Sequence, residues 1–114
     1  MKGMLCSVAM LLIVFFAHPS SGSTVIGFGG QTCGQWLEDR GRGGADAALD
    51  EAWILGYLSA WNSSNAGAAD GMLRNIDNAG IFAWIDGACS RHPLELIADA
   101  AGRLTAYLAK RIQR

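Results

Sequence analysis

The sequence has few of the residues on which hydrolytic and metal centres depend. It contains two histidines and three cysteines, and no two cysteines are close enough in the chain to form a metal-binding pair. No serine lies in a Gly-x-Ser-x-Gly turn, and the acidic neighbours Glu38–Asp39 and Asp50–Glu51 are expected to be solvated on helix exteriors. The sequence therefore predicts no catalytic, cofactor-binding or metal-binding residue, and a protein that is not an enzyme.

An excess of positive charge is also lacking. The chain has nine basic and ten acidic residues, and its basic residues are scattered except for Lys110, Arg111 and Arg114. Nucleic-acid-binding proteins gather lysine and arginine on one face, interleaved with aromatic residues. No such pattern occurs, so a nucleic-acid partner is not expected. The C-terminal basic group is explained by the negative end of a helix dipole.

No apolar run is long enough to cross a membrane comfortably. The longest, residues 4–17, follows Lys2 and is interrupted by Ser7, whereas a spanning helix needs about 20 residues. Small and polar residues follow at 18–23, the order found in secretory signal peptides. We predict a signal peptide at 1–22, with cleavage after Ser23 and an uncleaved membrane anchor as alternatives. The mature protein is then expected in the periplasm, without membrane attachment.

Removal of the signal peptide changes the number of cysteines. Cys6 is lost, which leaves Cys33 and Cys89 in an oxidising compartment. A disulfide between them is predicted, and the chain-entropy model gives such a loop about 4 kcal/mol of stabilisation. The alternative is a reactive thiol with His92 as its base. The disulfide is favoured because the cysteine number is even and no side chain is evidently placed to orient the histidine.

Four helices are expected in the mature chain, after a flexible arm at 23–31. The first begins with a capping box formed by Thr32 and Gln35. The second, 46–62, carries two apolar stripes, which predicts burial between other helices. Gly56 in its middle is expected where a neighbouring helix approaches closely. The fold class is all-α: a small orthogonal four-helix bundle at 32–114, held by one disulfide.

The third and fourth helices meet at a proline. Asp77 is expected to cap the third helix, and Pro93 is expected in the first turn of the last helix, where its missing N–H does no harm. The last helix has apolar residues spaced three or four apart and an Asp99–Arg103 pair.

Aromatic residues are the remaining candidates for function. Most are expected in the core because each ring buries much apolar area. Aromatic residues are also enriched at protein interfaces, and two of those in the helices, Trp61 and Trp84, flank the apolar stripes. The candidate interface residues are Trp36, Trp53, Tyr57, Trp61 and Trp84.

Three short segments resemble the HdeA-like periplasmic acid-stress chaperones. Segment 32–37 (Thr-Cys-Gly-Gln-Trp-Leu) resembles the start of these proteins, 55–57 (Leu-Gly-Tyr) resembles their central helix, and Ala88-Cys89 matches the position of their second cysteine. The resemblance covers about 32–108. It implies a dimer at neutral pH that dissociates in acid and exposes apolar surface to unfolded client proteins.

The helical, disulfide-linked pattern is also similar to the Tai-type immunity proteins, which neutralise type VI secretion toxins. Segment 56–59 and His92-Pro93 carry this likeness, although some of those proteins have additional cysteines. It implies a stable fold with one tightly bound protein partner and no acid activation. A cell-envelope protein that shares only the fold is the third alternative, since fold does not fix function.

Overall fold

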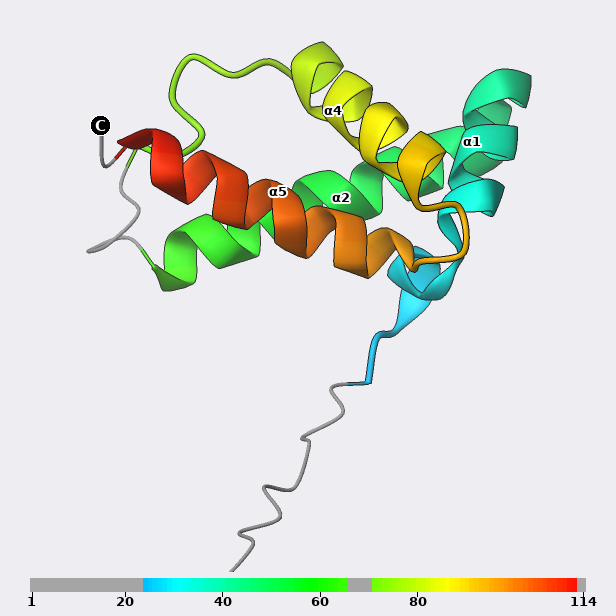
Figure 1. The fold of residues 1–114 in the computed structure, drawn as a ribbon, viewed down its shortest axis with the longest axis horizontal. Helices are drawn as coiled ribbons and strands as arrows, with labels where there is room; N and C mark the ends of the chain where they lie inside the picture. The colour runs from blue at the N-terminus through cyan, green and yellow to red at the C-terminus, as the bar shows by residue number, and fades with distance from the viewer. Residues whose placement is uncertain (1–23, 66–70, 113–114) are drawn as a thin grey trace, which may run out of the picture.

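The computed structural model describes residues 24–65 and 71–112, and over these ranges the protein is an all-α bundle, as predicted. A short 3-10 helix η1 (Gly27–Gly30) precedes α1 (Cys33–Arg42), α2 (Gly44–Ser64), α4 (Asn78–Arg91) and α5 (Ile97–Ile112). In Figure 1, α1 lies at one end of the bundle, and it packs against both α2 and α4. The predicted signal peptide at 1–22 lies outside the described residues.

The beginning of α1 is fixed partly by its own cap and partly by a distant segment. Thr32 Oγ1 accepts the Gln35 N–H at 3.2 Å, as predicted, but the Gln35 side chain donates to Asp39 and does not complete a capping box. Two further N–H groups at the helix start, those of Cys33 and Gly34, donate to carbonyls at 2.7 and 2.8 Å. Those carbonyls belong to the α4–α5 connection, so this connection closes the end of α1.

The junction between the last two helices corrects a prediction. Asp77 caps α4 as expected, accepting the Gly80 N–H at 2.7 Å. Pro93, however, does not begin α5. Residues 92–96 are a connection held against the start of α1, and α5 begins at Ile97. Asp99 accepts the Leu96 N–H at 3.1 Å and so acts at the start of α5, while Arg103 forms its ion pair with Glu95 and not with Asp99 as predicted.

Helix α2 is fully buried along one side only, so its predicted burial between other helices is confirmed in part. Its buried residues step by three or four, and the helix packs against α1, α5 and η1. Four further apolar residues of α2 are half-buried against the core, whereas Leu49 is 48% exposed. The buried residues are Ala47, Asp50, Ile54 and Leu58.

The glycine-rich segment is packed against α2, which corrects the expectation of a flexible arm over 27–30. The Trp53 indole donates its N–H to the Ile26 carbonyl at 3.0 Å. Gly29 is buried beneath that ring, and a Cβ placed on Gly29 would lie 2.1 Å from the nearest ring carbon. Only a residue without a side chain permits the indole to approach the backbone this closely.

Gly56 has the opposite environment, and its replacement provides a test of helix propensity. It is exposed, and a Cβ built there meets no heavy atom within 4 Å, so the expected close helix contact is absent at this position. Gly56→Ala should raise the free energy of unfolding by about 1 kcal/mol, because alanine loses less backbone entropy in a helix. Urea unfolding followed by circular dichroism measures this difference. Gly29→Ala is the contrasting variant and should destabilise; a Gly56→Ala variant no more stable than the parent would contradict the assignment.

The core lies where the four helices meet. Its fully buried large side chains include Trp36 of α1, Ile54 of α2, Ile85 of α4, and Ile97 and Leu104 of α5. Burying a side chain of this size contributes about 1.5 to 3 kcal/mol, so each helix is held mainly by its apolar stripe. None of the helices in the described ranges combines the length and apolar character that crossing a bilayer requires.

Candidate functional site

The predicted disulfide joins α1 to α4. Cys33 and Cys89 are bonded, both are fully buried, and their Cα atoms are 4.7 Å apart. The bridge lies in the first turn of α1 and near the end of α4. It therefore fixes one end of the α1–α4 contact covalently, and the rest of that contact depends on non-covalent interactions.

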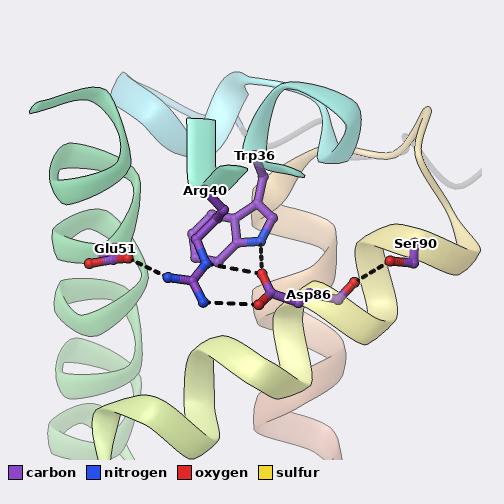
Figure 2. Close-up of polar contacts among 5 residues, drawn as sticks. All are labelled: Trp36, Arg40, Glu51, Asp86 and Ser90. Atoms are coloured by element: carbon purple, nitrogen blue, oxygen red, sulfur yellow. Dashed lines mark hydrogen bonds and ion pairs between the residues drawn. The ribbon is translucent and has the colours of Figure 1, made fainter. Parts of the chain in front are cut away.

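A cluster centred on Arg40 fastens the same two helices further along α1 (Figure 2). Arg40 donates from Nε and Nη2 to the two carboxylate oxygens of Asp86 on α4, at 3.1 and 2.9 Å. Its third group, Nη1, donates to Glu51 on α2 at 2.7 Å. One guanidinium therefore connects three helices, and the fork geometry of arginine suits the two-oxygen contact with Asp86.

Aromatic rings enclose this guanidinium. Its central carbon lies 5.6 Å from the Trp36 ring centroid and 5.5 Å from that of Phe82, both within cation–π range. The buried Trp36 indole also donates its N–H to Asp86 at 2.7 Å. Asp86 is held in turn within α4, where its carbonyl accepts the Ser90 hydroxyl at 2.8 Å (Figure 2).

Ionisation maintains the cluster. The side chains of Arg40, Asp86 and Glu51 are 27 to 35% exposed, so water screens them only in part. The hydrogen bonds that Arg40 donates to Asp86 raise the pKa of Arg40 above its ordinary value, and the charges of Asp86 and Glu51 add to the effect. The guanidinium stays charged at every accessible pH. The strength of the cluster therefore varies with the protonation of its carboxylates.

A second pair of acidic side chains is buried between α1 and α2. Asp39 is 2% exposed and Asp50 is 0% exposed, so the prediction that both face solvent is wrong. Asp39 accepts hydrogen bonds from Arg42 and, at 3.0 Å, from Gln35. The two oxygens of Asp50 have no donor among the described residues. An ionised Asp50 would therefore be a buried charge without compensation.

The two carboxyl groups consequently have different proton affinities. Burial raises the pKa of Asp50 to about 6, and the negative charge of Asp39 adds to this effect. Once protonated, Asp50 donates a hydrogen bond to the Asp39 carboxylate. The hydrogen bond from Arg42 lowers the pKa of Asp39 below its ordinary value. The pair thus holds one proton near pH 5, on Asp50.

The candidate interface residues do not form one surface. Trp36 is fully buried, so it is not on the surface of the folded protein. The half-buried Trp53 stacks on Tyr57 with ring centroids 5.5 Å apart, on the part of α2 that faces η1. Trp61 lies half-buried towards the other end of α2. Trp84 of α4 pairs instead with Tyr107 of α5, a residue that sequence analysis did not select.

The Arg40 cluster and the buried carboxyl pair were not predicted from the sequence. Periodicity carried a usable signal for the latter, since Asp50 lies three residues after Ala47 and four before Ile54, on the buried stripe of α2. Asp39 likewise lies three residues after the buried Trp36. For Arg40 and Asp86, separated by 46 residues, no local pattern indicates the contact.

His92 is exposed, three residues after the bridged Cys89, and its Nδ1 lies 3.8 Å from a Glu95 carboxylate oxygen. Within 24–65 and 71–112, no three His, Cys, Asp or Glu side chains are grouped to hold a metal ion. Comparison of the chain with protein-family models, curated proteins and solved structures finds no match.

Proposed function

We propose that this is an exported, non-enzymatic protein-binding protein that acts as an acid-stress chaperone of the HdeA-like type. The observation that carries the proposal is the Arg40 cluster, in which every hydrogen bond from the guanidinium to α2 and α4 ends on a carboxylate. In strong acid, the helices would loosen and expose apolar surface to unfolded client proteins. The predicted signal peptide and the disulfide support action in the periplasm.

Protonation removes the cluster's attractive charges. At pH 2 to 3 most carboxyl groups of proteins carry a proton, and a neutral Asp86 binds a guanidinium much less strongly than a carboxylate does. The guanidinium beside the Trp36 and Phe82 rings would then lack its negatively charged partner, and the Trp36 indole would donate to a weaker, neutral acceptor. The net positive charge of the acidified chain adds repulsion.

The disulfide limits how far such an opening goes. Because Cys33 and Cys89 join α1 to α4 at one end of their contact, the two helices stay tethered after the ionic contacts are lost. The aromatic surface between them would open without complete separation of the elements. A tethered chain also refolds more readily after neutralisation, since the loop-closure entropy is already lost in the open state.

The primary test is suppression of client aggregation in acid. The oxidised protein is mixed with an unrelated aggregation-prone client at about pH 2 to 3, below ordinary carboxyl pKa values. Light scattering measures aggregation, and size-exclusion chromatography measures the oligomeric state at each pH. We expect a dimer at neutral pH, dissociation in acid, and suppression of aggregation in acid only. Absence of suppression by a protein that stays compact would overturn the proposal.

Asp86→Asn tests the role assigned to the cluster. The amide has the shape of the protonated acid, so the variant should lose about 1 kcal/mol of stability at neutral pH. It should also suppress aggregation from a higher pH, by roughly half a unit or more. Asp46→Asn removes the same charge from an exposed position that makes no ion pair within the described residues, and should behave like the parent. If the parent and both variants begin to suppress aggregation at the same pH, the cluster does not control activation by acid.

A dedicated binding protein, such as a Tai-type immunity protein or an envelope protein that shares only the fold, is the alternative. It requires a stable fold at neutral pH and one tight protein partner. A compact, inactive protein in the acid assay would direct the search to such a partner. The most informative next observation would then be whether a toxin gene lies beside this one.

A further inference from the structure

The surface between α4 and α5 carries two adjoining hollows that share the rings of Trp84 and Tyr107. The hollows measure about 300 and 360 Å³. The two ring centroids are 5.8 Å apart, Trp84 is half-buried and Tyr107 is 48% exposed. From their connection at 92–96, α4 and α5 spread apart towards the opposite end of the bundle (Figure 1). We call this surface the α4–α5 groove.

Positive charge lines the groove on both sides of the aromatic pair. Arg91, Arg103 and Lys110 line the larger hollow together with His92, and Arg111 lines the smaller one. Arg103 forms an ion pair with Glu95. The ion pairs among the described residues do not include Arg91, Lys110 or Arg111. Asp77 is the one carboxylate among the described lining residues, and it caps α4 at the far end of the smaller hollow.

This concentration of charge contrasts with the chain as a whole, which has one more acidic than basic residue. The acidic residues gather elsewhere: five lie between Glu38 and Glu51, on α1 and α2. The C-terminal end of α5 gains from nearby cations through the helix dipole, which explains Lys110 and Arg111. Arg91 in the last turn of α4 gains from the dipole of its own helix in the same way. The dipoles do not explain why the exposed Tyr107 lies between these cations.

We infer that the α4–α5 groove binds an acidic segment of a partner polypeptide that inserts an apolar side chain beside Trp84 and Tyr107. Charge complementarity selects the acidic partner, and the two adjoining hollows with aromatic walls suit a side chain better than a flat lipid surface. Half-buried aromatic residues flanked by arginine are typical of the side chains that dominate binding energy at interfaces. This inference rests on the proposal that the protein binds polypeptides, and it adds the chemistry of the partner.

The test uses the oxidised protein at pH 7 and a fluorophore-labelled peptide of alternating Glu and Asp around a central Leu-Phe pair. Fluorescence anisotropy measures the Kd. We expect Lys110→Glu and Arg91→Glu each to raise the Kd about tenfold or more, and Tyr107→Ala to do the same. Raising the salt concentration from about 20 to about 300 mM should also weaken binding, because exposed charges are screened. Arg74→Glu, an exposed charge reversal outside the groove, should leave the Kd unchanged.

Several outcomes would overturn the inference. One is that a peptide with Gln and Asn in place of Glu and Asp binds as tightly as the acidic peptide. Another is that Arg74→Glu raises the Kd as much as the groove variants do. A third is that the parent protein does not bind the acidic peptide. Preference for anionic phospholipid vesicles would indicate a membrane surface instead, and self-association abolished by Tyr107→Ala would indicate a second copy of the chain. Melting curves show that each variant is folded. Suppression of client aggregation in acid is measured separately. Peptide binding by the groove and chaperone activity can therefore be disproved independently of each other.

Discussion

Replacing both bridged cysteines by alanine is expected to lower the free energy of unfolding by about 4 kcal/mol, the estimate for a closed loop of this length. Cys33 and Cys89 are 56 residues apart in sequence, so the bridge removes much conformational freedom from the unfolded chain. A domain this small gains little from its core beyond the entropy cost of folding. Loss of the bridge should therefore unfold a large fraction of the molecules at 37 °C.

Urea unfolding at pH 7, with and without reductant, measures the effect. Alanine is the appropriate replacement because both positions are fully buried and a serine hydroxyl would lack a partner. Reductant should destabilise the parent as much as the double substitution does, and should leave the variant unchanged. A loss below about 1 kcal/mol in both comparisons would show that the bridge is not a principal source of stability.

Asp50→Asn is expected to raise the free energy of unfolding at pH 7 by roughly 2 to 3 kcal/mol. Burial raises the pKa of Asp50 to about 6 in the folded protein, above the ordinary carboxyl value of 3.8. At pH 7 the folded protein therefore contains a buried, ionised Asp50 without a hydrogen-bond donor among the described residues. Asparagine removes that charge and supplies an N–H for the Asp39 carboxylate.

The same pKa determines the pH dependence of the parent. A carboxyl group with a raised folded-state pKa contributes stability that is fully present below its unfolded pKa and is lost as the pH rises through about 6. Stability should therefore increase by about 1 kcal/mol from pH 7 to pH 5. The lowered pKa of Asp39 has the opposite sign: its contribution is present above its unfolded pKa and is lost as the pH falls through its folded value.

Chemical unfolding at several pH values between 4 and 8 tests both statements. Asp50→Asn should abolish the rise between pH 7 and pH 5. Asp46→Asn, which removes an exposed charge on the same helix, should keep most of the rise, because burial and Asp39 raise the Asp50 pKa more than Asp46 does. A parent protein whose stability is constant from pH 7 to pH 5, or an Asp50→Asn variant less stable than the parent at pH 7, would contradict the assignment of the proton to Asp50.

The sequence by itself determined the all-α class and the disulfide. Helix caps such as Thr32 and Asp77 act over three residues, and apolar spacing acts over one or two turns. The disulfide followed from an expected compartment and an even cysteine number, without any knowledge of geometry. Predictions that depended on what lies beside a residue failed: the place of Pro93 before α5, the close approach at Gly56 and the exposure of Asp39 and Asp50.

Only the tertiary structure decided which side chains from different helices are in contact. Arg40 meets Asp86 across 46 residues, and Trp84 meets Tyr107 across two helices, through pairings that no local pattern specifies. Asp50 lies on the buried stripe of α2, yet whether a donor reaches it depends on the rotation of α1 against α2. Capping and periodicity are local properties of the chain, whereas burial, pKa and surface charge arise where separate helices pack together.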